Sequence, residues 1–200
     1  MSKSRGNVIN PDHVIEQFGA DSLRLYEMFM GPLEQVKPWS TKGVDGVNRF
    51  LNRAWRLLVD EEIGSLKTVE KEPTKAELKT IHTVIKKVTE DIEGMRFNTA
   101  ISALMIFVNE ANSWKEIPKS IASDFLLILN PFAPHIAEEL WYKLGNNESM
   151  GYVKWPTFNE DYLKEEEIMF PVQVNGKVRA DIYVPVEEAK NKEFVLDLAK

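Results

Sequence analysis

The chain has 200 residues, of which 44% are hydrophobic and 28% charged, an ordinary composition for a globular protein of one or two domains. It contains no cysteine, which excludes disulfides, thiolate metal sites and cysteine nucleophiles, and its three histidines show no metal-ligand spacing. No apolar run is long enough to span a membrane. The net charge of −6 argues against a uniformly basic nucleic-acid binder, so such a surface would have to be formed by local cations.

The first 60 residues predict three helices. Asn10 is suited to cap the first and Asp21 the second, because short polar side chains accept hydrogen bonds from the free N–H groups of a helix start. The third begins at Ser40 or Thr41, and its apolar residues recur at steps of three and four positions. That spacing puts them on one face, so the third helix should pack against a core.

Four further amphipathic helices are predicted between residues 74 and 145. After a polar linker at residues 60–73, a Thr-x-x-Glu capping box starts the first of them at Thr74. Asn98 is suited to cap the next, residues 118–130 form another, and the last starts at Pro134. Short joints between amphipathic helices are typical of an antiparallel bundle.

Two alternating apolar stretches around an Asn-Gly pair predict a β-hairpin. A two-residue turn at Asn175 and Gly176 would put the apolar residues of the two strands on opposite faces. We therefore predict a three-residue loop from Val174 to Gly176, with Gly176 in the left-handed conformation, so that Val172 faces Val178.

The predicted fold class is mainly α: an antiparallel helical bundle followed by a small α+β piece that contains the hairpin and a helix at residues 187–199. A lone hairpin and helix bury too little surface for independent stability, so we expect this last domain to be incomplete. The expected organisation is 1–40 for a loop and helices that end a preceding domain, 41–157 for the bundle, and 158–200 for a linker and the incomplete domain.

Several segments carry a resemblance to a known family. The opening Met-Ser-Lys-Ser-Arg-Gly-Asn resembles the Lys-Met-Ser-Lys-Ser loop of class I aminoacyl-tRNA synthetases without its first lysine. It is followed, in family-like order, by NPDHVIEQFGADSLRLYEMF, WSTKGVDGVNRFLNRAWRLL, RFNTAISALMIFVNE, NPFAPHIAEELW and FPVQVNGKVRADIYVP. Together they resemble the leucyl-tRNA synthetases of bacterial type, from the signature loop into the C-terminal domain. The resemblance implies a bundle of the anticodon-binding type of that class.

Two alternatives stay open beside this interpretation. One is the corresponding part of a valyl-, isoleucyl- or methionyl-tRNA synthetase, although the absence of cysteine and the Val-Gln-Val-Asn-Gly-Lys-Val hairpin favour leucine. The other is a stand-alone tRNA-binding or protein-interaction module without catalysis.

The resemblance implies a leucine–tRNA ligase that activates leucine with ATP and Mg²⁺ and transfers it to tRNA(Leu). It assigns Lys3 as the catalytic residue, and the ATP-binding loop comprises Met1, Ser2, Lys3 and Ser4. The nucleotide-binding and editing domains of the family would precede this segment, so we expect the chain alone to be inactive and to bind no cofactor. The resemblance also implies a monomeric, cytoplasmic parent enzyme without membrane contact, and no metal site in this segment.

Local cations give the candidate tRNA-binding residues. On the third helix they form one stripe with no acidic residue among them: Lys42, Arg49, Arg53 and Arg56. On the hairpin they are Lys177 and Arg179, beside the polar Gln173 and Asn175. A second helical stripe comprises Lys75, Lys79, His82 and Lys86. Each set is equally compatible with a solvated outer face.

Overall fold

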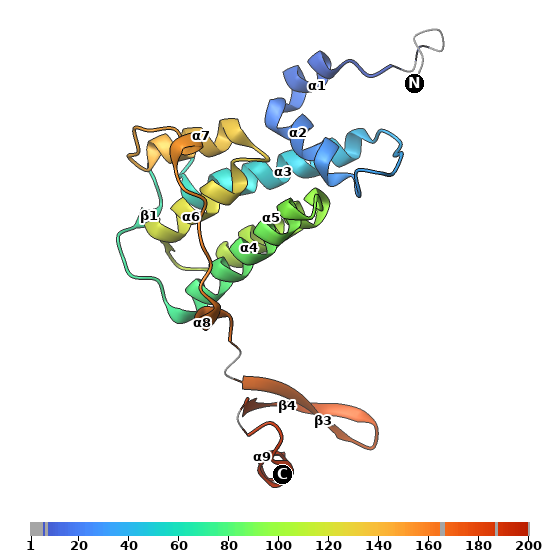
Figure 1. Ribbon diagram of the computed structural model, residues 1–200, viewed down its shortest axis with the longest axis vertical. Coiled ribbons are helices and arrows are strands. Elements are labelled where there is room, and N and C mark those ends of the chain that lie inside the picture. Colours follow the sequence, from blue (N-terminus) through green and yellow to red (C-terminus); the bar gives the residue numbers. More distant parts are fainter. Residues whose placement is uncertain (1–5, 7, 165–166, 187, 200) are drawn as a thin grey trace. The chain divides into compact units, whose positions relative to one another are not determined.

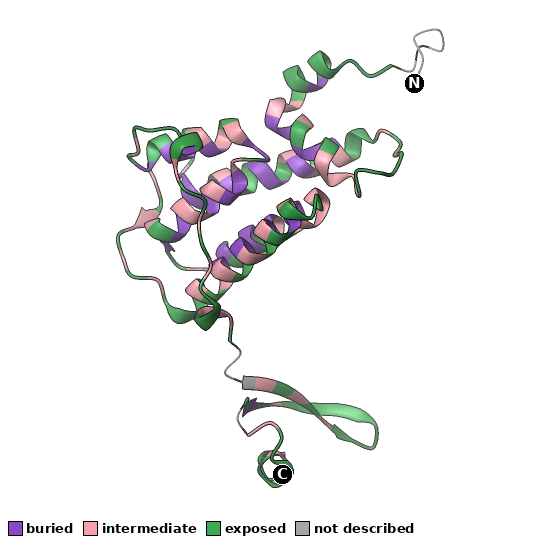
Figure 2. Cartoon of the chain, viewed as in Figure 1, coloured by how far each residue is buried: buried purple, intermediate pink, exposed green. Residues whose placement is uncertain are grey.

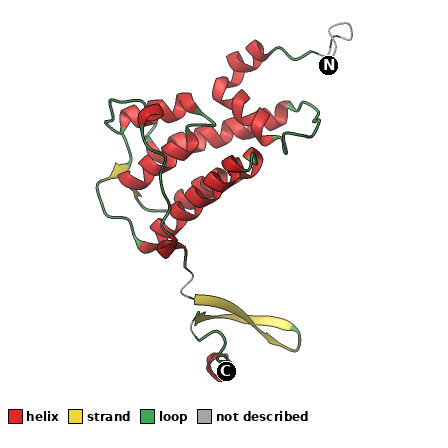
Figure 3. Cartoon of the chain, viewed as in Figure 1, coloured by secondary structure: helices red, strands yellow, loops and turns green. Residues whose placement is uncertain are grey.

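The computed structural model describes residues 6, 8–164, 167–186 and 188–199 (Figure 1). The chain divides into two compact units, Met1–Asn159, here called the helical unit, and Glu160–Lys200, here called the hairpin unit. Helices form most of the described residues and the strands are few, which confirms the mainly α prediction (Figure 3).

The described residues of the helical unit form seven α-helices, one short 3₁₀-helix and two short strands. The helices are α1 Pro11–Phe18, α2 Ala20–Phe29, α3 Thr41–Leu58, α4 Lys75–Glu93, α5 Phe97–Ala111, α6 Lys119–Leu129, α7 Pro134–Lys143 and the 3₁₀-helix η2 Met150–Tyr152. Three predicted helix starts are confirmed by their caps. Asn10 accepts a hydrogen bond from the N–H of Asp12, Ser40 accepts one from Gly43, and Thr74 forms a complete capping box with the helix it starts.

Two predicted caps are wrong. Helix α2 begins after Gly19 without a side-chain cap, and the carboxylate of Asp21 bonds instead to the start of α7. Helix α5 begins two residues earlier than expected, so Asn98 lies inside it and Arg96 occupies the cap position. Asp21 bonds to α7 and not to the start of its own helix, so in this case a tertiary contact overrides the local cap preference.

The predicted polar linker contains a short strand. Strand β1, Thr68–Val69, pairs in parallel with β2, Ile117–Pro118, and Val59 forms an isolated bridge with Leu66. The pairing of β1 with β2 joins segments far apart in the sequence, and two-residue strands leave no periodic signal by which they could be predicted.

The core of the helical unit lies between the helices, where α4 packs on both α5 and α6 and α2 packs on α3, α5 and α7. Figure 2 shows the buried residues along the inward faces of these helices. The largest side chains that are almost completely buried include Phe107, Phe125 and Phe132, and the rings of Phe107 and Phe125 stack with their centroids 4.8 Å apart.

The hairpin unit contains α8 Glu160–Leu163, β3 Glu167–Val174, β4 Lys177–Pro185 and α9 Lys192–Leu198. Strands β3 and β4 are antiparallel, but the predicted three-residue loop is wrong. Val174 pairs with Lys177 across a two-residue turn, in which Asn175 and Gly176 have φ values of 55° and 75°. Two successive left-handed residues are what a two-residue hairpin turn of this twist requires.

A β-bulge restores the apolar alignment that this turn would otherwise lose. Gln173 pairs with Val178 while Val172 pairs with Ala180, so Arg179 is an extra residue on β4. Beyond the bulge, Phe170 faces Ile182. The extra residue that aligns the apolar side chains of the two strands therefore lies within β4, and the turn keeps two residues. The final helix is also shorter than predicted.

Candidate nucleic-acid interface

The four cations predicted on α3 are brought together on its outer side, and all are exposed: Lys42, Arg49, Arg53 and Arg56. Two of them form ion pairs. The Nε atom of Arg49 lies 3.3 Å from a carboxylate oxygen of Asp45, and that of Arg56 lies 3.1 Å from a carboxylate oxygen of Glu61. The expectation that the stripe contains no acidic residue is therefore wrong, because Asp45 lies one turn before Arg49.

These ion pairs reduce the positive charge of the stripe without blocking it. The side chains of Arg49 and Asp45 are 72% and 55% exposed, and a pair so accessible to water contributes little free energy. A phosphate can therefore compete for the guanidinium, which has further N–H donors. Lys42 and Arg53 have no ion pair with any residue that the structure describes.

Hydrogen bonds hold helix α3 against both α1 and α2, which fixes the position of its outer side. The Nδ2 of Asn48 donates hydrogen bonds to the carbonyl of Phe18 and to the hydroxyl of Ser22, both at 3.0 Å. At the start of α3, the hydroxyl of Tyr26 accepts a hydrogen bond of 2.6 Å from the N–H of Ser40, which is the N-cap of the helix. A rigid helix presents its cations at fixed spacing, as recognition of an RNA backbone requires.

The second predicted stripe, on α4, is partly covered by the chain that follows η2. The N–H of Asn159 donates to Nδ1 of His82 at 3.2 Å, and Nζ of Lys86 lies 5.4 Å from the ring centroid of Phe158. Burial lowers the pKa of His82, which favours the neutral imidazole that can accept this bond. Two of the four residues of this stripe, His82 and Lys86, thus contact residues 158–159 of the same chain. Helix α3 is therefore the better candidate for a nucleic-acid interface.

The hairpin residues are exposed as well: Gln173, Asn175, Lys177 and Arg179. Lys177 follows the turn directly and Arg179 is the bulged residue. A bulge re-aims the side chains around it, so the two cations do not follow the simple alternation of a regular strand.

Two polar clusters in the helical unit were not predicted. Asp21, only 7% exposed, accepts hydrogen bonds from the start of α7, whose own cap position is Ala133. Asp91 is completely buried at the end of α4, where Arg96 and Lys87 bond to its carboxylate. Burial by itself raises the pKa of Asp91, but the hydrogen bonds from Lys87, Thr99 and Arg96 outweigh it and the pKa is lowered. One sequence feature could have pointed to the Asp21 cluster. Helix α7 starts at Pro134, and Ala133 before it has no polar side chain to cap the helix, so a cap has to come from elsewhere.

The signature loop, Met1–Ser4, lies outside the described residues, and so does the position assigned to catalysis, Lys3. Among the described residues, no cluster of histidine, aspartate and glutamate could bind a metal ion. In the same part of the chain, no helix has the length and hydropathy needed to cross a bilayer.

Comparison with known proteins supports the same origin for both ends of the chain. Residues 1–37 match the family model of class I tRNA synthetases for I, L, M and V, and residues 75–194 match that of the anticodon-binding domain of tRNA ligase. Helix α3 lies between these two matched ranges.

Named relatives are leucine–tRNA ligases. Those of Leptospira biflexa serovar Patoc (strain Patoc 1 / Ames) and Chlorobaculum parvum (strain DSM 263 / NCIMB 8327) are 54% and 50% identical over 200 residues, which is 100% of this chain but 23% and 24% of theirs. The chain therefore spans about a quarter of the length of these relatives. The resemblance to leucyl-tRNA synthetases is confirmed.

A solved structure is also similar to the whole of this chain. The crystal structure of the ternary complex of Agrobacterium radiobacter K84 agnB2 LeuRS, tRNA and LeuAMS matches 100% of this chain and 27% of that one, with a TM-score of 0.76 and 34% identity. The family match to residues 75–194 covers more than half of the sequence. The chain belongs to the family of anticodon-binding domains of tRNA ligases.

Proposed function

We propose that this chain forms the signature-loop and tRNA-binding part of a leucine–tRNA ligase, which activates leucine with ATP and transfers it to tRNA(Leu). The observation that carries the proposal is the identity of 50% or more to leucine–tRNA ligases along all 200 residues. Because those relatives are about four times longer, the nucleotide-binding and editing domains would be the partners of this segment. The complete enzyme would act in the cytoplasm as a monomer.

The proposed role of Lys3 follows from the chemistry of amino-acid activation. When a carboxylate attacks the α-phosphate of ATP, negative charge develops on the departing pyrophosphate. A lysine on a loop can meet that charge as it forms, and such a contact stabilises the transition state more than bound ATP. Ser2 and Ser4 add donors for phosphate oxygens, and Mg²⁺ would enter with the ATP phosphates.

In the complete ligase, Lys3→Ala should slow ATP–pyrophosphate exchange about 100-fold, which corresponds to a loss of roughly 3 kcal/mol in transition-state stabilisation. Lys3→Arg should recover part of the rate. The 200-residue chain by itself should show no exchange, and exchange at the rate of a complete synthetase would contradict the proposed division of labour.

The proposed tRNA surface consists of the α3 cations, with Lys177 and Arg179 of the hairpin as a second contact. Support comes from the exposure of all four α3 cations and from the hydrogen bonds that hold α3 against α1 and α2. A row of cations contacts phosphates irrespective of base sequence, which suits recognition of a tRNA by its shape.

Fluorescence anisotropy of the chain with a leucine tRNA and with a tRNA of short variable arm, at two salt concentrations, tests this surface. Lys42→Glu with Arg53→Glu should weaken binding about tenfold or more and flatten the salt dependence. Lys190→Glu, an exposed charge change in the hairpin unit, is the matched control. Failure of the unchanged chain to bind either tRNA at low salt would overturn the proposal.

A further inference from the structure

Helix α3 contains two glycines, and only one of them is explained by packing within the chain. A Cβ atom on Gly43 would lie 2.5 Å from a ring carbon of Tyr26, so this glycine lets α2 and α3 approach. A Cβ atom on Gly46 would meet nothing within 4 Å. Glycine is among the least favourable residues in a helix interior. The absence of a side chain at Gly46 therefore calls for a reason outside the packing of this chain.

Gly46 lies in a surface depression between α3 and α5, which we call the notch. It is lined by Gly46, Arg49, Phe50 and Arg53 from α3 and by Met105 and Asn109 from α5. The two helices pack against each other, so the walls of the notch belong to one rigid part of the bundle. A missing side chain at one end of such a depression leaves room for a ligand to approach the helix backbone closely.

The charges of the notch favour an anion. Arg49 and Arg53 lie four residues apart, so their side chains project from the same face of α3. Arg53 has no ion pair among the described residues, and Arg49 has only the exposed pair with Asp45. Two guanidinium groups on neighbouring turns can hold one phosphate between them.

The uncharged lining favours a sugar over a base. Bases that leave their stack are usually held on an exposed aromatic face. Among the described residues that line the notch, Phe50 is the one aromatic residue, and it is 6% exposed, so it offers an apolar floor but no stacking face. Met105 is half-buried beside it, while Asn109 is exposed and carries an amide that can donate to or accept from a hydroxyl.

We propose that the notch binds one ribose–phosphate unit of the RNA backbone, with the phosphate between Arg49 and Arg53, the ribose beside Gly46, and the 2′-hydroxyl against Asn109. This inference rests on the proposed function, because it names the part of the tRNA that the α3 surface holds. It makes Gly46 a determinant of RNA affinity through the space that it leaves, and Asp45 a competitor of the phosphate.

The test measures anisotropy of a fluorescein-labelled tRNA(Leu) transcript with Gly46→Leu, which fills the notch without meeting any protein atom near its Cβ. RNA affinity should fall about tenfold, while the urea midpoint should stay the same or rise. The control is Ala76→Leu, on an exposed position of α4 outside the notch, which should leave the affinity unchanged. Asp45→Asn should raise the affinity severalfold.

A second arm tests the sugar. Asn109→Ala should lower the affinity for an RNA hairpin more than that for a DNA hairpin of the same sequence, because only the RNA has the 2′-hydroxyl. Suppose that the unchanged chain binds tRNA and that Arg53→Glu weakens this binding, but Gly46→Leu does not. The proposal that the notch binds the RNA backbone is then overturned, and the proposed function stands. That outcome would be expected if a protein segment occupied the notch. If the unchanged chain binds no tRNA, both proposals fail.

Discussion

The carboxylate of Asp21, on α2, caps α7 by accepting a hydrogen bond of 2.8 Å from the backbone N–H of Ile136. Its other oxygen accepts a bond of 3.3 Å from the N–H of His135 and lies 2.7 Å from Nδ1 of that ring. Nearby, Arg24 donates to the carbonyl of Pro131 at 3.0 Å. These hydrogen bonds therefore fix α2 to the start of α7 and to the loop that precedes α7.

Replacement of Asp21 by alanine should therefore lower the free energy of unfolding by about 2 kcal/mol, because two partly buried N–H groups of α7 lose their acceptor. Asp21→Asn keeps one oxygen and should cost about half as much. Urea unfolding followed by tryptophan fluorescence measures this in the helical unit alone, which contains all five tryptophans. Glu27→Ala, exposed on the same helix, is the control, and an equal loss there would contradict the assigned role.

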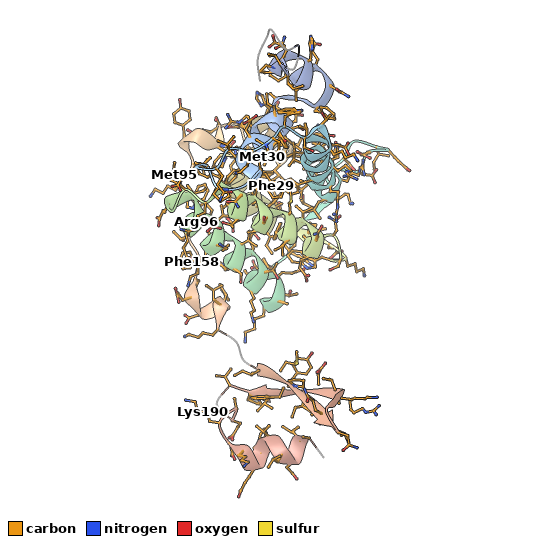
Figure 4. The ribbon with its side chains drawn as sticks, turned by 90° about the vertical axis from the view of Figure 1, so that its right-hand side faces the viewer. Phe29, Met30, Met95, Arg96, Phe158 and Lys190 are labelled. Carbon is orange, nitrogen blue, oxygen red and sulfur yellow. The ribbon has the colours of Figure 1, made fainter. Side chains whose placement is uncertain are left out.

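The turn between α4 and α5 depends on a contact between Gly94 and Arg96. Figure 4 labels Arg96. Arg96 bonds to the buried Asp91 and, at 2.8 Å, to the carbonyl of Glu90, which places its guanidinium over Gly94. A methyl group at position 94 would overlap with that guanidinium. Gly94→Ala should therefore destabilise the helical unit by about 1–2 kcal/mol by displacing Arg96.

The same substitution should cost almost nothing once Arg96 is alanine, because the overlapping group is gone. A double-mutant cycle measured by urea unfolding tests this, with a coupling energy of at least about 1 kcal/mol expected. Additive effects of Gly94→Ala and Arg96→Ala would show that Gly94 is needed for the backbone conformation of the turn and not to make room for the guanidinium of Arg96.

The bond between His82 and Asn159 should make the end of the helical unit sensitive to acid. Burial lowers the pKa of His82 in the folded chain, so the unfolded chain binds more protons as the pH falls below about 6.5. The stabilisation is complete above that value and is lost as the pH falls through the folded pKa, when Nδ1 becomes protonated and can no longer accept.

Amide hydrogen exchange of Asn159, followed by NMR between pH 7.5 and 5 and corrected for intrinsic rates, should show loss of protection at the lower pH. His82→Gln should remove this pH dependence. Lys79→Gln, one turn earlier on α4, should leave it in place. A pH profile that is the same with and without His82 would rule out the histidine as its cause.

Deletion of Arg179 removes the extra residue of β4, so the strands should keep their register without a bulge. Deletion of Arg179 should keep Val172 opposite Ala180 and Phe170 opposite Ile182, because the two-residue turn still pairs Val174 with Lys177. Cross-strand NOEs measure the pairing. Arg179→Ala keeps the residue count and should retain both the bulge and the pairs. A slip that brings Asp181 opposite Val172 after the deletion would show that the bulge sets the register.

Local physics made several helix starts predictable from the sequence. A cap at Asn10, Ser40 or Thr74 is formed within one turn of the helix that it starts, so every atom it needs is nearby in the sequence. The apolar faces of the helices were predictable for the same reason, because their spacing depends only on the helix period. The resemblance of whole segments to leucyl-tRNA synthetases was likewise present in the residues themselves.

Contacts between distant segments decided the rest. The carboxylate of Asp21 could cap either α2 or α7, and packing of α2 against α7 selected the second. The α3 and α4 stripes looked equally exposed until residues 158–159 covered part of α4 and left α3 accessible. The sequence by itself determined which elements form and which of their faces are apolar or basic. Only the tertiary structure decided which polar groups meet, because a hydrogen bond between distant residues depends on where the packed helices bring them.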